Sequence, residues 1–336
     1  MWLAAESAAS LRPGAAMTSV DLPSPSMLRR RTQRRIACLC ALLVLLLVSL
    51  SAYLRLSKAG LGCTPWPQCY GQAVREQQQG MASSEAALQG LALARLAHRA
   101  IASVALVLVL ILAMSALTAR PAQRGEVWSS IGLLALALFL AGLGLLSGSS
   151  RLPAVAIGNL LGGFGMLALS WRLVGTGAMV NPARAALARC AAITLCAVVA
   201  QIVLGGLVSA SFADLSCTGY EDCAGIAARQ GWPWSSLNPW HEPVLDITSH
   251  APPNPDGALA QLAHRVWALV VLLAMLPTVW VAWRARLYWH GFGLVALLAL
   301  QIAAGLWLLT PVLPLGAALL HNLLAALMVT VLVSLL

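Results

Sequence analysis

Three histidines lie inside long apolar segments of this chain, where an ionisable side chain needs a chemical reason. His98 and His264 each open such a segment within the same tetrapeptide, Leu-Ala-His-Arg, and His321 lies in the last one. Ionisable groups at membrane depth are costly and rare, so each of these residues is a candidate functional residue. Because neutral imidazole binds first-row metals well, the pattern predicts a metal site built from histidines.

Three sequence patterns recur in the same order, which indicates an internal duplication. A Cys-x5-Cys pair begins at Cys63 and again at Cys217, 154 residues later, and the His-Arg sequence recurs after 166 residues. Downstream, Asn159-Leu160-Leu161 is repeated as Asn322-Leu323-Leu324, 163 residues later. Each half therefore carries a copy of one functional unit, and residues can be compared between the copies.

The two copies differ in their histidines. His264 and His321 belong to the second half and lie at the same depth, which is a common arrangement for holding a heme iron from both faces in a helical bundle. The repeat alignment places Gly158 where the second half has His321, so the first half keeps only His98. We predict a six-coordinate heme in the second half and an open iron face in the first.

An arginine follows the first histidine of each half. Arg99 and Arg265 lie at the water boundary, where a guanidinium can pair with a heme propionate; simple snorkelling to the surface is the alternative. The remaining histidines, His241, His250 and His290, lie in a loop or at a segment end, where we expect solvated or interfacial side chains.

The cysteines form two sets. Those of the two repeated pairs lie in loops on the outer face, where an oxidising compartment favours disulfides, so we expect Cys63 to bond Cys69 and Cys217 to bond Cys223. Metal ligation is the alternative, and a disulfide here can be a structural clip or a redox group. The other set is expected to be small buried apolar side chains: Cys38, Cys40, Cys190 and Cys196.

The elements that must position these residues are membrane-spanning helices. The 336-residue chain is 60% hydrophobic and only 10% charged, against about 25% charged residues in soluble proteins. Eight apolar runs reach the roughly 20 residues that a span requires. The predicted spans are 36–54, 93–118, 127–147, 153–175, 190–211, 259–283, 290–310 and 314–335. The predicted fold class is all-α and polytopic, with two tandem parallel four-helix bundles.

Charge sets the expected orientation and the domain boundaries. The net charge of +10 comes mostly from arginines in short loops on one side, which should be the cytoplasm and gives no indication of nucleic-acid binding. We expect a bacterial cytoplasmic (inner) membrane protein with both termini inside. Residues 1–35 are expected to be a disordered basic tail, 36–176 and 190–336 the two halves, and 177–189 a cytoplasmic linker.

These patterns together resemble the heme A synthase family over about residues 36–335. The resemblance is carried by residues 55–69, Arg-Leu-Ser-Lys-Ala-Gly-Leu-Gly-Cys-Thr-Pro-Trp-Pro-Gln-Cys, and by residues 201–208, Gln-Ile-Val-Leu-Gly-Gly-Leu-Val. The two His-Arg sequences and His321 complete it. Trp-Pro between loop cysteines just after a first span is the most specific of these features.

The resemblance implies a function and a division of roles. Family members convert heme O to heme A, oxidising one porphyrin methyl group to a formyl for cytochrome oxidase. It implies a cofactor heme b on His264 and His321, and a substrate heme with His98 as a ligand. Implied partners are heme O, membrane lipid, heme O synthase, cytochrome oxidase assembly factors and a second copy of the chain, with the electron donor left open.

The chain departs from the family pattern at two positions of the first half. Arg95 stands where the family usually has the glutamate of Glu-x-x-His-Arg, and Gly158 stands at a histidine position. An arginine cannot accept the proton that a carboxylate would take. An electron carrier or heme-handling assembly factor without the oxidation is therefore the first alternative. A transporter is the second, although the spans carry few of the midplane charges that it would need.

Overall fold

The computed structural model describes residues 25–336, apart from 62, 81–90, 121, 147–149, 176–184, 218, 220–221, 247–253 and 311. All regular structure in these residues is helical, as predicted. Eight of the described helices are long and apolar enough to cross a membrane, so the protein is a multi-pass membrane protein. His250 falls outside the described residues.

The eight long helices follow the predicted spans closely, because each apolar run is bounded by turn-forming or charged residues. They are α1 (Pro25–Ala59), α4 (Ala92–Leu117), α5 (Arg124–Leu146), α6 (Pro153–Gly175), α7 (Ala185–Ala210), α9 (Ala258–Arg284), α10 (Tyr288–Trp307) and α11 (Leu315–Ser334). The shorter ones are α2 (Gln72–Gln78), α8 (Asp222–Arg229) and the 3-10 turns η2 (Trp234–Leu237) and η3 (Pro255–Gly257).

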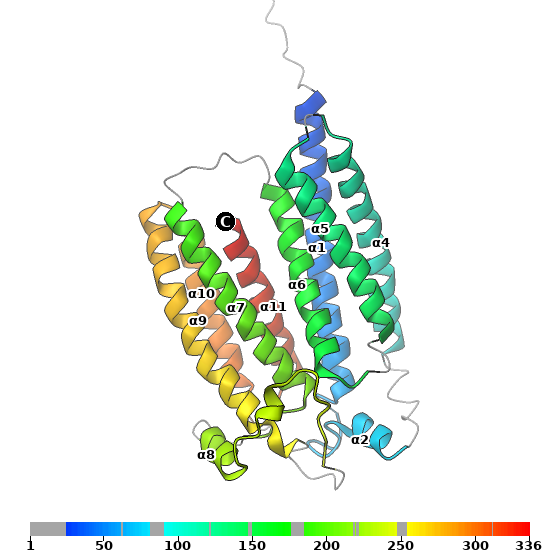
Figure 1. Ribbon diagram of the computed structural model, residues 1–336, viewed down its shortest axis with the longest axis vertical. Coiled ribbons are helices and arrows are strands. Elements are labelled where there is room, and N and C mark those ends of the chain that lie inside the picture. Colours follow the sequence, from blue (N-terminus) through cyan, green and yellow to red (C-terminus); the bar gives the residue numbers. More distant parts are fainter. Residues whose placement is uncertain are drawn as a thin grey trace, which may run out of the picture.

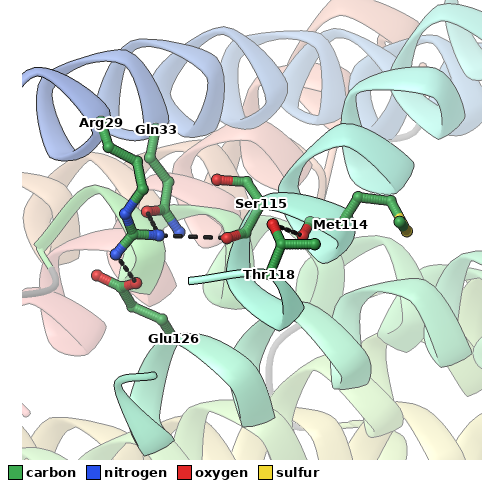
Figure 2. A network of polar contacts seen from close by, with 6 residues as sticks. All are labelled: Arg29, Gln33, Met114, Ser115, Thr118 and Glu126. Atoms are coloured by element: carbon green, nitrogen blue, oxygen red, sulfur yellow. Dashed lines mark hydrogen bonds and ion pairs between the residues drawn. The ribbon is translucent and has the colours of Figure 1, made fainter. Parts of the chain in front are cut away.

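The expected disorder of residues 1–35 is wrong at its C-terminal end, since α1 already begins at Pro25. Figure 2 shows the reason: the Arg29 guanidinium reaches neighbouring helices as well as its own. It lies 3.3 Å from the nearly buried carboxylate of Glu126 on α5 and donates to the Ser115 carbonyl on α4 at 3.2 Å. Gln33, one turn further along α1, accepts a third bond from Arg29. These contacts order the basic segment as helix.

The two halves pack in corresponding ways (Figure 1). In the first half α1 contacts α4 and α6, and α5 contacts α4 and α6; in the second, α7 contacts α9 and α11, and α10 contacts α9 and α11. The halves meet through α1 and α6 on one side and α7 and α11 on the other. This pairing is consistent with two tandem bundles of the same orientation.

The end of the bundle that carries α2 and α8 holds the long segments that follow α1 and α7 (Figure 1), and both the start of α1 and the C-terminus lie at the other end. We call the former the loop end. There a cluster of buried apolar side chains joins the last turn of α1 to the segments after α1 and α7: Leu56, Ala59, Leu61, Tyr70, Phe212 and Leu245. Leu315, Ala318 and Leu319 of α11 pack against it, so the loop of the first half touches the second.

Candidate functional site

The structure brings His264 of α9 and His321 of α11 together near the loop end of the second half. Their ring centres lie 6.5 Å apart, with the planes inclined at 65°. Two imidazoles that bind opposite faces of one iron, each with a nitrogen about 2 Å from the metal, have ring centres roughly 6 Å apart. The observed separation therefore fits a shared metal between the rings.

The His264 ring rests against α7. The side-chain nitrogen of Gln201 lies 3.1 Å from Nδ1 of His264 and 3.0 Å from its main-chain oxygen. One turn further along α7, a Cβ added to Gly205 would lie 2.8 Å from the Cε1 atom of His264. The missing side chain at Gly205 thus leaves the space that the imidazole occupies.

The His321 ring rests against α10 in a similar way. A Cβ added to Gly305 would lie 3.4 Å from the Cε1 atom of His321. The Nδ1 atom of His321 is buried and has no hydrogen-bond partner among the described residues. An unpaired buried nitrogen costs roughly 1–3 kcal/mol, so its retention beside a second histidine supports a ligand-binding role.

Arg265 and Arg99, the candidate propionate contacts, have different surroundings. Arg265 donates to the Gln261 side-chain oxygen at 3.1 Å and to the Gly219 carbonyl at 2.7 Å, which ties α9 to the second disulfide loop. Arg99, in contrast, has an exposed side chain on α4. Both guanidinium groups lie one residue after a candidate ligand, so their prediction as propionate contacts stands as a proposal.

His98 lies half-buried on α4, in the first half. At the position corresponding to His321, Gly158 faces α5: a Cβ added there would lie 2.9 Å from the Leu143 Cδ2 atom. Arg95, one turn before His98, lies close enough to Lys58 for their charges to interact. The first half therefore offers one histidine in a cationic setting at its loop end.

Both predicted disulfides are present, Cys63–Cys69 and Cys217–Cys223, so the alternative of metal ligation by these sulfurs is not needed. The expectation that the other cysteines are buried is correct for Cys40, whereas Cys38 and Cys190 are half-buried. It is wrong for Cys196, which is exposed on α7 because it faces away from the helices that pack there.

A polar contact between the halves was not predicted from the sequence. The Tyr70 hydroxyl donates to the Asp214 carboxylate at 2.5 Å, and Arg55 donates to Ser209 Oγ at 2.8 Å. Burial and the negative Asp214 raise the pKa of the Tyr70 phenol well above its usual range. Burial also raises the pKa of Asp214, opposed by the Tyr70 hydrogen bond and the Arg55 charge.

The bond between Arg55 and Ser209 could have been predicted from one sequence signal. Arg55 and Ser209 are 154 residues apart, the offset of the two cysteine pairs, so they occupy corresponding positions of the two copies. Tyr70 and Asp214 do not correspond in the repeat, and they lie in irregular segments without periodicity. Only the folded structure reveals that pair.

The fold and the site define a class: a duplicated, multi-pass helical membrane protein with a pair of facing histidines in one half. Comparison with known proteins agrees, since the family model described as cytochrome oxidase assembly protein, COX15-CtaA, matches residues 34–333. The chain belongs to this family. A heme A synthase of Shewanella oneidensis is 31% identical over 317 residues, which cover 86% of this chain and 91% of the relative.

Proposed function

We propose that this protein is a heme A synthase-type membrane oxidoreductase that oxidises a methyl group of heme O to the formyl group of heme A. The observation that carries the proposal is the 6.5 Å pairing of His264 and His321, in a family whose members assemble cytochrome oxidase. If water supplies the inserted oxygen atom, the electrons taken from the methyl carbon pass to an external acceptor and the protons to solvent. If dioxygen supplies it, dioxygen is itself the oxidant, and its second oxygen atom leaves as water with electrons from an external donor.

The second half is proposed to hold the cofactor, a heme b with His264 and His321 as axial ligands. A bound heme supplies one-electron chemistry at this place. The chain's own contribution is to fix the ligands, since Gln201 contacts the His264 ring. Arg265, which is held at the water boundary by the Gly219 carbonyl, would pair with a heme propionate. Two firm axial ligands suit a group that stays bound.

The first half is proposed to bind the substrate heme. His98 is its only candidate axial ligand, and Gly158 leaves the opposite face without one, which suits a molecule that must enter and leave. Arg99, and Arg95 beside Lys58, supply positive charge for the propionates. Arg95 cannot accept a proton, so protons released from the methyl group pass to another acceptor.

We place the protein in the bacterial cytoplasmic (inner) membrane with both termini in the cytoplasm. The basic residues at the start of α1 lie at the end opposite the disulfide loops, which fits the excess of arginine on cytoplasmic faces. Heme O is the proposed substrate, and a heme O synthase and oxidase assembly factors are the proposed partners.

The activity can be tested in a bacterial host that makes heme O but no heme A. Hemes extracted from cells with and without the protein are separated by chromatography. We expect heme A only in cells that contain the protein, and less or none with His98→Ala. Heme O without any heme A, in cells where the protein is present and carries heme, would contradict the proposal.

A second candidate function is heme binding without the oxidation, as in an electron carrier or an assembly factor. Two observations favour it: Arg95 replaces the expected carboxylate, and Gly158 replaces a histidine. In that case the same extraction yields heme b bound to the protein and unchanged heme O. The extraction therefore separates the two functions.

A further inference from the structure

The helices beside both paired histidines carry the same short pattern, Gln-Ile-x-x-Gly. It spans 201–205 on α7 and 301–305 on α10. Residues four apart lie on one face of a helix, so each glutamine stands one turn from its glycine on the face toward a histidine. The pattern therefore gives each candidate ligand a carboxamide and a gap where a side chain is missing.

On α7 the pattern contacts His264 directly. The Gln201 side-chain nitrogen is 3.1 Å from Nδ1, and the ring fills the place of a Gly205 side chain, 2.8 Å from its Cβ position. The Gln201 side-chain oxygen, Oε1, is buried and has no hydrogen-bond partner among the described residues. Rotation of the amide would turn Oε1 toward Nδ1, and it would give up the bond that the side-chain nitrogen donates to the His264 main-chain oxygen at 3.0 Å.

On α10 the pattern flanks His321. The Cβ position of Gly305 is 3.8 Å from Nδ1, and the main chain of Gln301 interacts with the ring. Both Nδ1 of His321 and the side-chain oxygen of Gln301 are buried without a hydrogen-bond partner in the described part of the chain. A ring nitrogen and a carboxamide oxygen are thus left without a partner on neighbouring helices.

An imidazole that binds iron through one nitrogen keeps a proton on the other, and that N–H needs an acceptor. The side-chain oxygens of Gln201 and Gln301 are buried acceptors without a partner among the described residues. The Gln201 side chain contacts the His264 ring, and Gln301 lies one turn before the glycine that faces His321. Such a hydrogen bond fixes the ring orientation and makes the imidazole a more basic ligand.

The first half has no glutamine at either of the two corresponding positions. Subtracting the repeat offset of 154 from 201 and 205 gives Leu47 and Ser51 on α1. Subtracting 163 from 301 and 305 gives Leu138 and Gly142 on α5. No carboxamide therefore stands at the corresponding positions around His98 and Gly158.

We infer that Gln201 and Gln301 are positioning residues that accept the Nδ1–H bonds of His264 and His321, each seated over a glycine. This inference rests on the proposed heme b of the second half. It explains why that half retains its heme, whereas the first half, with leucines at both positions, holds an exchangeable one.

The test uses four variants of the full-length protein: Gln201→Leu and Gln301→Leu, which carry the residue of the other half, and Gln201→Glu and Gln301→Glu. The midpoint potential of the low-spin heme is measured by potentiometric titration. A more basic axial ligand stabilises ferric iron, so each Leu variant should raise the potential and each Glu variant should lower it relative to wild type.

Gln33→Leu is the matched control, because Gln33 is a buried glutamine of a spanning helix at the opposite end of the bundle, and it should leave the potential unchanged. Equal potentials in all variants, or shifts of one sign for Leu and Glu, would overturn the inference. Wild-type protein that purifies without any low-spin heme would instead contradict the proposed cofactor, so the two failures are distinguishable.

Discussion

At the scale of single residues, the paired histidines are the part of the site that the sequence predicted best. Their depth could be read from the apolar segments, and the duplication showed that only the second half keeps both. Gln201 and Gln301 were missed as functional residues, because their role depends on which helix faces which histidine. Tyr70 and Asp214 were missed because they lie 144 positions apart in the sequence, each in an irregular segment.

His264→Ala and His321→Ala should each abolish the low-spin heme spectrum of the purified protein, because a single remaining imidazole leaves the iron five-coordinate. The absorption bands and the heme-to-protein ratio are the measurements. His290→Ala removes a histidine at the start of α10 and should leave the spectrum unchanged. If both site variants keep the full low-spin spectrum, the ligand assignment is wrong.

Tyr70→Phe should remove an alkaline transition. Because the folded pKa of Tyr70 is raised, the neutral phenol contributes stability that is complete below its unfolded pKa near 10 and is lost as pH rises through the folded pKa. The wild-type melting temperature should therefore fall at strongly alkaline pH, more than that of the variant. Melting curves at several pH values check this, and identical alkaline slopes would refute it.

At the scale of elements, seven of the eight predicted spans agree with the helices to within about five residues, a usual error for boundaries. The apolar runs determine these helices, since length and hydropathy suffice to define a span. The start of α1 could not be predicted in the same way. Its basic first turns are polar, and contacts with α4 and α5 support their helical form.

Glu126→Ala should destabilise the end of the bundle at which α1 begins. The carboxylate is 3% exposed and faces Arg29, so its removal leaves the half-buried guanidinium without its carboxylate partner, a loss of about 1–3 kcal/mol. Arg151→Ala is the control, because its pair with Glu242 is more exposed and contributes at most about 1 kcal/mol. The apparent melting temperature in detergent should fall more for the first variant. Equal falls would contradict the role of the Arg29 contacts.

At the scale of the whole molecule, one repeated unit has become two sites with different ligation. Restoring the missing ligand with Gly158→His should add a second low-spin heme and slow product release. A Cβ added at this position would meet the Cδ2 end of Leu143, a flexible group that can rotate away. Gly158→Gln, similar in size without an imidazole, should add none. Unchanged heme content in the His variant would argue against a heme site at this position.

The central claim is that the second half keeps its heme while the first half exchanges one, and a heme-binding titration of the purified protein tests it most directly. Heme O is added to the wild type and to His98→Ala, and bound heme O and heme b are both quantified after gel filtration. The account predicts that the variant loses heme O binding and keeps the wild-type amount of heme b. Loss of heme b, or unchanged binding of heme O, would contradict it.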